Sequence, residues 1–342
     1  MSEPRKRRST GSITLADVAK KAGVGTMTVS RALRTPELVS EKLREKIQQV
    51  VEDLGYIPNK AAGALASAES YSIALIIPSV FEKACALFLP RFQQTLNKAG
   101  YQLLIGYSDY SIEQEEKLLT TFLQSRPAGV VLFGSEHSQR TGQLLQGFNA
   151  PVLEIAEMSS HANYLNIGID YFEVGKTCTK HLIERGFKNI AFIGARGNHF
   201  TMQRKLQGWQ SAMIENYLAP DHFLTTHEAP SSQLGAEGLA QLMLRDSNLN
   251  ALVCSHEEIA IGALFECHRR VLKVPTNMAI ICLEGSSMGE HAYPSLTSAE
   301  FDYEQMGIQA ADKLLQAIKC KPVDKSTQVG FKLIQRASTA LN

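Results

Sequence analysis

The chain has 342 residues, of which 44% are hydrophobic and 20% charged, and its formal net charge is +1. A chain of this length and composition can bury sizeable cores, so we expect two or three folded domains. We find neither an apolar run of membrane-spanning length nor a secretory leader, which excludes membrane and exported classes and favours a cytoplasmic protein with no membrane association.

The charge is distributed unevenly along the chain. Residues 1–66 contain 12 Lys plus Arg and 7 Asp plus Glu, whereas the remainder is mildly acidic. A basic head on an acidic body favours binding of a polyanion by the head. The run "RKRR" predicts a flexible cationic arm over residues 1–12, although a solubilising tail is an equally good interpretation.

Two short helical patterns flank the turn "AGVG" in "TLADVAKKAGVGTMTVSRAL", residues 14–33. Thr14 and Asp17 have the spacing of a capping box, and Gly23 supplies a left-handed residue that ends the first helix. Val29 and Ala32 give the second helix a buried face. Such short helices contribute little to a core, so the arrangement predicts a second helix that is presented outward.

The outward face of that second helix is chemically mixed. It carries Thr26, Met27, Thr28 and Arg31, which combine hydrogen-bonding, apolar and cationic groups. This mixture suits a helix that reads base edges in a major groove. The alternative is a small helical bundle with a solvated polar face.

A third helix and an alanine-rich segment complete the N-terminal region. Ser40 is the predicted N-cap of the third helix, which Gly55 ends, giving a helix-turn-helix domain over residues 13–57. We predict a hinge over residues 58–69, because "NKAAGALASA" is too short for a stable isolated helix and contains Gly63. It would fold on binding a partner, or serve as an ordinary linker.

Three stretches carry a family resemblance: "ITLADVAKKAGVGTMTVSRAL", "VSEKLREKI" and "LGYIPNKAAGAL". Together they resemble the DNA-binding headpiece of the lactose-repressor (LacI) family. The resemblance implies that the second helix reads the major groove of a palindromic operator, and that a leucine, matching Leu65, enters the minor groove at its centre. The DNA-contacting positions implied or suggested are Thr26, Met27, Thr28, Arg31, Asn59, Lys60, Ala62 and Leu65.

Residues 70–342 alternate apolar strand patterns with helical patterns. Eight strand runs are recognisable: "IALII", "YQLLIGY", "AGVVLF", "PVLEI", "LNIGI", "NIAFIGA", "ALVCS" and "MAIICL". This rhythm predicts an α/β domain made of two parallel-sheet subdomains with a cleft between them. It resembles the periplasmic sugar-binding fold that LacI-type repressors join to their headpiece, which implies an effector-binding and dimerisation domain in a homodimer or tetramer.

Several motifs invite an enzymatic interpretation. "GSSMG", residues 285–289, matches G-x-S-x-G, but no acid and histidine follow in hydrolase order. "HEEIA" lacks the second histidine of a zinc protease because Ala260 occupies its place. The six cysteines are far apart and the nine histidines lack ligand spacing. We therefore predict reduced thiols, no metal, no cofactor and no enzymatic activity.

Polar side chains follow several predicted strands, where ligands bind in α/β folds. The candidate effector-binding residues are Ser79, Lys83, His137, Arg196, Lys205, Glu257 and Glu284. Glu257 matches a family position, usually Asp, that accepts hydrogen bonds from sugar hydroxyls. Arg196 or Lys205 could bind the carboxylate of a sugar acid. Glu284 departs from this pattern, because an acidic side chain facing an anionic ligand is unfavourable.

Within the family, the stretches "TMTVSRAL", "GYIPNKA", "GVVLFGSEHSQRT", "IGIDYFE" and "GALFEC" resemble those of the gluconate and idonate repressors. We therefore predict a DNA-binding repressor of sugar-acid utilisation genes that is controlled by a gluconate-like effector. The alternatives are the same regulator responding to a neutral sugar or a phosphorylated intermediate, a sugar-binding protein without a DNA role, and an enzyme of carbohydrate metabolism.

Overall fold

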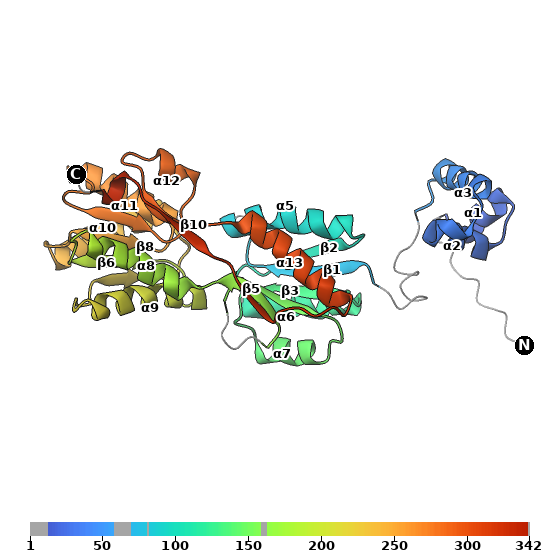
Figure 1. Cartoon of the computed structure of the whole chain (residues 1–342), viewed down its shortest axis with the longest axis horizontal. Coiled ribbons are helices and arrows are strands. Elements are labelled where there is room, and N and C mark those ends of the chain that lie inside the picture. Colours follow the sequence, from blue (N-terminus) through green and yellow to red (C-terminus); the bar gives the residue numbers. More distant parts are fainter. Residues whose placement is uncertain (1–12, 58–69, 81, 159–162, 341–342) are drawn as a thin grey trace, which may run out of the picture. The chain divides into compact units, whose positions relative to one another are not determined.

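The computed structural model describes residues 13–57, 70–80, 82–158 and 163–340 (Figure 1). The chain divides between residues 69 and 70 into two compact units, here called the N-terminal and C-terminal units. The predicted arm over residues 1–12 lies outside the described residues. So do the predicted hinge and its candidate DNA contacts, which are Asn59, Lys60, Ala62 and Leu65.

The N-terminal unit is a three-helix bundle. It contains α1 (Leu15–Ala22), α2 (Thr26–Arg34) and α3 (Glu41–Leu54), with a short 3-10 helix η1 (Pro36–Leu38) before α3. One apolar cluster joins the three helices. Its buried members are Val18, Ala19, Ala22, Val29, Ala32, Ile47, Val50 and Val51.

The predicted capping of α1 is confirmed. The Thr14 side chain accepts from the Asp17 backbone N–H, and Asp17 Oδ2 accepts from the Thr14 backbone N–H at 2.8 Å. Gly23 follows α1 with a φ of 70°, and Gly55 follows α3 with a φ of 63°, both in the left-handed region. These two glycines end α1 and α3, and the first leaves only a tight turn before α2.

The C-terminal unit contains two six-stranded sheets, one in each of two lobes. The first sheet is parallel, in the order β11-β5-β4-β3-β1-β2. Its strands are β1 (Ser72–Ile77), β2 (Gln102–Tyr107), β3 (Gly129–Phe133), β4 (Val152–Glu157), β5 (Leu165–Ile169) and β11 (Ser326–Gln328). Its helices are α5 (Lys83–Lys98), α6 (Ile112–Gln124), α7 (Gln139–Gln146) and α13 (Tyr303–Ile318). Helices α5 and α13 pack on one face, and α6 and α7 on the other.

The second sheet has the order β12-β10-β9-β8-β6-β7, with only β12 antiparallel to its neighbour. Its strands are β6 (Ile190–Gly194), β7 (Phe223–Thr225), β8 (Ala251–Cys254), β9 (Ala279–Cys282), β10 (Thr297–Phe301) and β12 (Phe331–Ile334). Its helices are α8 (Tyr171–Glu184), α9 (Phe200–Glu215), α10 (Ser232–Arg245), α11 (Glu257–Arg269), α12 (Ser287–His291) and the 3-10 helix η2 (Ala337–Thr339). The α8–α9 pair covers one face of this sheet and the α10–α11 pair the other.

The predicted α/β fold with two parallel-sheet subdomains is therefore confirmed. All eight predicted strand runs form strands, and they correspond to β1–β6, β8 and β9. The sequence analysis missed β7, β10, β11 and β12, which are short or partly polar. The chain passes between the lobes three times, through the β5–α8, β10–α13 and β11–β12 connections.

Close contact between α8 and α9 fixes one wall of the second lobe. A Cβ atom on Gly208 would lie 2.1 Å from the Phe172 carbonyl oxygen, and one on Gly175 would lie 2.3 Å from the Lys205 carbonyl oxygen. Only glycine permits these two backbones to approach so closely. The packing therefore sets the position of the Lys205 backbone, whose side chain belongs to the candidate site.

Candidate nucleic-acid interface and effector cleft

Helix α2 presents its candidate DNA-contacting side chains on the surface of the N-terminal unit. Met27 is 75% exposed, Thr26 and Arg31 are exposed, and Thr28 is half-buried. The N-cap is Gly25 in an extended conformation, without a side-chain cap. The first-turn backbone N–H groups of α2 are therefore not covered by a capping side chain, and they can also face an anion such as a phosphate.

The Arg31 guanidinium has no ion-pair partner within residues 13–57 and the other described ranges. It stands on a helix whose opposite face is fixed by buried Val29 and Ala32. A cation held in this way can reach a base edge or a phosphate without first leaving an intramolecular partner. Its contact with DNA stays a prediction.

The carboxyl ends of the strands in the two lobes face each other across a cleft. Lys83, at the start of α5, donates to the carbonyl oxygen of Gly285, which follows β9. The Phe200 N–H, at the start of α9, donates to Glu136 Oε2 beyond β3 at 3.2 Å. Arg196, which follows β6, pairs with Glu82 before α5. Ligands bind at such strand ends in open α/β sheets.

Lys205 and Glu284 form a buried ion pair in the second lobe. Lys205 Nζ lies 2.5 Å from Glu284 Oε1 and 3.3 Å from the Ser255 carbonyl oxygen, and Lys205 is 1% exposed. The ammonium also lies 4.9 Å from the centroid of the Tyr171 ring. Pairing with Lys205 compensates the charge of Glu284, so the acidic residue that the sequence analysis found unfavourable has a partner inside the protein.

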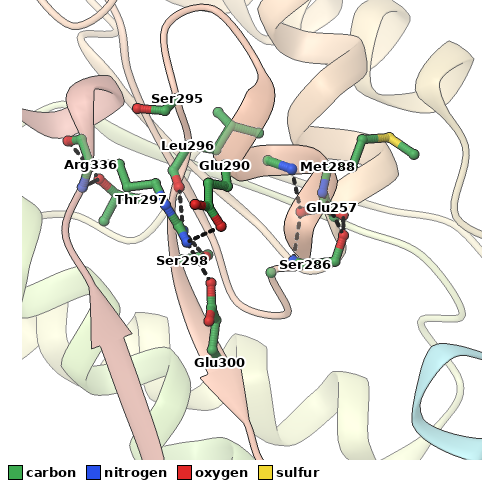
Figure 2. A network of polar contacts seen from close by, with 12 residues as sticks. Glu257, Ser286, Met288, Glu290, Ser295, Leu296, Thr297, Ser298, Glu300 and Arg336 are labelled. Atoms are coloured by element: carbon green, nitrogen blue, oxygen red, sulfur yellow. Dashed lines mark hydrogen bonds and ion pairs between the residues drawn. The ribbon is translucent and has the colours of Figure 1, made fainter. Parts of the chain in front are cut away.

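The carboxylate of Glu257 accepts hydrogen bonds from within the protein (Figure 2). Its Oε1 accepts from the backbone N–H groups of Ser286 at 2.6 Å and Gly289 at 2.9 Å, and its Oε2 accepts from the Ser286 hydroxyl. A carboxylate with three donors at the start of α12 stabilises the loop that follows β9. Its predicted role as acceptor of ligand hydroxyls stays a prediction, and any ligand would have to share these lone pairs.

A second network beside α12 holds the last strands together (Figure 2). Arg336 donates through Nη1 to the Leu296 carbonyl oxygen at 3.1 Å and to Ser298 Oγ at 3.0 Å. Its Nη2 lies 2.8 Å from Glu300 Oε1 and 3.8 Å from Glu290 Oε2. Arg336 therefore links β10 to α12 and helps to hold α12, which the Glu257 hydrogen bonds also fix.

His137 lies apart from the cations of the cleft. It is buried between α6 and the first sheet, with Nδ1 2.8 Å from Glu115 Oε1 and Nε2 3.9 Å from Glu154 Oε1. Burial alone would lower the pKa of His137, but the hydrogen bond and charge of Glu115 raise it above its usual value. Burial raises the pKa of Glu154 to about 7. The geometry assigns His137 to an internal acid–base cluster.

A cavity of about 160 Å³ lies at the carboxyl ends of the first sheet, under the start of α9. Its polar lining includes Ser108, Glu115, Ser135, Glu136, Glu157 and His199. The Ser135 backbone N–H donates to Glu157 Oε1 at 2.9 Å. The lining supplies acceptors that suit the hydroxyl groups of a small ligand. Ser79 lies near the end of β1 and is half-buried, so it also stays a candidate.

Three residues of the cleft were missed by the sequence analysis: Glu82, Tyr110 and Glu157. The Arg196 guanidinium carbon lies 3.6 Å from the Tyr110 ring centroid, and the Tyr110 hydroxyl donates to Glu82. Lys83 was selected because polar side chains that follow a strand often bind ligands in α/β folds. The same reasoning applies to Tyr110, which follows β2, and to Glu157, at the end of β4. Glu82 could have been found because it precedes Lys83 directly.

The residues of the two enzyme-like motifs, "GSSMG" and "HEEIA", contact each other in the structure. Ser287 is the first residue of α12, and the glutamate that contacts this segment accepts from backbone N–H groups. Among the described residues there is no group of three or more His, Cys, Asp or Glu with metal-binding geometry. Within the same residues, no helix combines the length and apolarity required to cross a bilayer.

Comparison with known proteins identifies both parts of the chain. The model for bacterial regulatory proteins of the lacI family matches residues 14–59, and that for a periplasmic binding protein-like domain matches residues 179–339. The chain is 34% identical over 320 residues to the HTH-type transcriptional regulator GntR of Escherichia coli K12, which covers 93% of this chain and 96% of that protein.

Two solved structures are also similar. A PurR family transcriptional regulator from Vibrio parahaemolyticus is 82% identical with a TM-score of 0.77, and the match covers 80% of this chain and 100% of that one. The lac repressor dimer bound to operator and the anti-inducer ONPF is 22% identical with a TM-score of 0.86, over 96% of this chain and 99% of that one. At that identity the second likeness shows the fold alone.

These matches confirm the family that the headpiece motifs predicted, and they agree with the helix-turn-helix and two-lobed architecture on which the sites are built. The chain belongs to the lacI family of bacterial regulatory proteins, which are DNA-binding transcription regulators and not enzymes.

Proposed function

We propose that this regulator is a repressor of sugar-acid utilisation genes that acts in the cytoplasm on a palindromic operator. Helix α2 reads the major groove through Thr26, Met27, Thr28 and Arg31. The hinge over residues 58–69 contacts the minor groove. The exposure of Met27 and Arg31 on a helix capped by glycine supports the reading role.

The effector we propose is a small sugar acid, with gluconate the first compound to test. The observation that carries this proposal is the presence of two cations, Arg196 and Lys205, beside the strand ends of the second lobe. Arg196 stacks on Tyr110, and Tyr110 lines the neighbouring cavity together with other polar and apolar side chains. A cation binds the carboxylate of the ligand, while Glu136 and Glu157 accept hydrogen bonds from its hydroxyls.

The regulator acts as a homodimer in this proposal. An apolar groove of about 580 Å³ lies between α11 and α12, and Phe265 (55% exposed), Met288 (64%) and Tyr293 (86%) line it. Exposed apolar surface of this kind marks interaction sites. The lac repressor, which has the same fold, is a dimer in its operator-bound structure. Phe265→Lys should shift the sedimentation coefficient toward that of a monomer.

Control of DNA binding follows from linkage. The effector favours one arrangement of the two lobes, and that arrangement favours or disfavours folding of the hinges on operator. Because coupling is reciprocal, operator DNA must change the affinity for the effector by the same factor.

A neutral sugar is the second candidate effector. The carboxylates of Glu136 and Glu157 in the cavity lining favour a neutral ligand, because they repel an anion that enters with its charged end first. The same repulsion makes a phosphorylated intermediate the weaker alternative. Titration calorimetry with gluconate, sorbitol, glucose and a glucose phosphate separates the candidates. Tighter binding of sorbitol or glucose than of every sugar acid would reject the sugar-acid assignment and leave the regulator intact.

A further inference from the structure

The two cations of the cleft differ in how fully their hydrogen-bonding capacity is used. Lys205 is 1% exposed and is engaged by Glu284 and the Ser255 carbonyl oxygen. The Arg196 side chain is 22% exposed, and its Nη2 contacts Glu82 Oε1 only at 3.4 Å. The buried Nε of Arg196 has no hydrogen-bond partner in the described part of the chain. Arg196 therefore has donors left for a ligand, whereas Lys205 has few.

Arg196 is also held in an unusual way. Its backbone φ is 53°, and Tyr110, which stacks under the guanidinium at 3.6 Å, has a φ of 60°. Non-glycine residues adopt this left-handed region rarely and at a cost, and such residues gather at functional sites. Two of them in direct contact, one from each lobe, place an arginine and an aromatic ring at the mouth of the cleft.

Glu82 completes this arrangement from the first lobe. Its Oε1 accepts from the Tyr110 hydroxyl and faces Arg196 Nη2. The Tyr110 ring orients the guanidinium of Arg196, and a guanidinium binds the carboxylate of a sugar acid through charge-assisted hydrogen bonds. The protein thus supplies its own carboxylate at the place where an anionic ligand would bind.

We propose that Glu82 is a resident carboxylate that occupies Arg196 and holds the cleft closed, and that an anionic effector binds by replacing it. The proposal rests on the proposed sugar-acid function for the identity of the effector, but not for the closure. Arg196 is then the specificity-determining cation, and Lys205 is the internal partner of Glu284.

The dimensions of the cleft support closure. The cavity of about 160 Å³ is smaller than the range of roughly 300–1,000 Å³ that small-molecule sites usually have. Two further contacts cross between the lobes: Lys83, next to Glu82, donates to the Gly285 carbonyl oxygen, and the Phe200 N–H donates to Glu136. Because Glu82 is the N-cap residue of α5, its displacement would also move Lys83 and loosen the contact with Gly285.

Ligand affinity tests the exchange of carboxylates. Titration calorimetry of the full chain with gluconate and with sorbitol, its neutral counterpart, would compare wild type with Glu82→Gln. The matched control is Glu304→Gln, which removes a carboxylate from an exposed pair with Arg91 outside the cleft. Glu82→Gln should bind gluconate about tenfold more tightly, because the protein carboxylate no longer competes with that of gluconate for Arg196. Sorbitol, which has no carboxylate, should stay within about twofold. Arg196→Met should abolish the preference for gluconate over sorbitol.

Amide hydrogen exchange tests closure without any ligand. The Phe200 N–H donates across the cleft, so exchange of a peptide that contains it reports the contact between the lobes. Glu82→Gln should exchange at this peptide several-fold faster than Glu304→Gln and wild type. Unchanged exchange in Glu82→Gln would overturn the closure, and equal tightening of gluconate and sorbitol would overturn the carboxylate exchange. Failure of wild type to bind any sugar acid, with faster exchange in Glu82→Gln, would reject only the proposed effector.

Discussion

On α2 of the N-terminal unit the main candidate side chains are on the surface: Met27 is 75% exposed, and Arg31 is exposed with no ion pair in the described residues. In the C-terminal unit Lys205, Glu257 and Glu284 are buried or mostly buried and already paired. Lys205 is 1% exposed and lies 2.5 Å from Glu284, and Glu257 accepts from three donors. Surface groups can bind a partner without changing the fold. Buried groups can bind only by exchanging one partner for another.

This contrast predicts that substitutions on the surface of the N-terminal unit will change its affinity for DNA but not its stability. Substitutions of the buried, paired residues in the C-terminal unit should change both the affinity for the effector and the free energy of unfolding. Substitutions in the buried ion pair, the surface helix, the acid–base cluster and the hinge test it. Their expected effects decrease from about 3 kcal/mol for the buried pair to roughly 1 kcal/mol for the hinge.

The Lys205→Met variant should lower the free energy of unfolding of the C-terminal unit by about 3 kcal/mol, because it leaves Glu284 without its cation in a mostly buried site. The single tryptophan, Trp209, is fully buried in this unit, so its fluorescence in urea reports the transition. Arg91→Met, which breaks an exposed pair, should cost no more than about 1 kcal/mol. Equal losses in the two variants would contradict the contrast, and adding Glu284→Gln to Lys205→Met should restore part of the loss.

For the surface helix, Arg31→Ala should reduce specific operator binding to the level of residual phosphate contacts. The loss of a base contact of this kind corresponds to about 1–3 kcal/mol. Fluorescence anisotropy at matched salt measures the affinity, and circular dichroism during heating measures the stability of the headpiece, which should not change. If the variant binds operator as tightly as wild type, α2 is not the recognition helix.

The acid–base cluster around His137 gives a pH dependence. Burial raises the pKa of Glu154 to about 7 from a usual value of 4.5, so the stability that its protonated form contributes is complete below pH 4.5 and lost as the pH rises through 7. His137, whose pKa is also raised beside Glu115, acts in the same direction above pH 6.5. Glu157 and Lys325 also influence Glu154.

Glu154→Gln removes one titrating group and keeps its shape. The stability of wild type relative to Glu154→Gln should fall by about 1–2 kcal/mol between pH 5 and pH 8, measured by urea unfolding at each pH. The surface variant Glu113→Gln is the control, and its difference from wild type should remain nearly constant. A constant difference for Glu154→Gln as well would show that the cluster does not titrate in this range.

The hinge provides the smallest pair of effects, in opposite directions. Gly63→Ala should strengthen operator binding by roughly 1 kcal/mol, because alanine favours the helix that we expect on DNA. Leu65→Ala should weaken binding and reduce DNA bending, because a minor-groove wedge is removed. Gel mobility of permuted operator fragments measures the bend. The same bend with Leu65→Ala would exclude the wedge.

The local features of this protein were predictable from its sequence. Capping by Thr14 and Asp17 and the stop at Gly23 are confirmed, since each depends on residues a few positions apart. The eight apolar runs became strands for the same reason. The exposed side of α2, which carries Thr26, Met27 and Arg31, was also predictable, because the buried Val29 and Ala32 fix the opposite side. Contact of these residues with DNA stays a prediction.

The pairing inside the cleft was not predictable in the same way. Lys205 and Glu284 are 79 residues apart, and their pairing depends on how the second lobe packs. Arg196 and Glu82 are 114 residues apart in different lobes, so their pairing also depends on how the two lobes close. The sequence analysis selected Arg196, Lys205 and Glu284 as cleft residues, but it treated each as available to a ligand, and it missed Glu82. It also included His137, which the fold buries against Glu115.

Operator binding in the presence and absence of effector is the decisive measurement for an effector-controlled repressor. Selection from random duplexes with the full chain should enrich a palindromic site, to which wild type binds in a strongly salt-dependent way. Gluconate should change the affinity for that site by at least about fivefold, the usual lower range of allosteric coupling, and the operator should change the gluconate affinity by the same factor. Sorbitol should have little effect. If no sequence is enriched, or if no sugar acid changes the affinity for an enriched site, this chain is not a sugar-acid-controlled repressor.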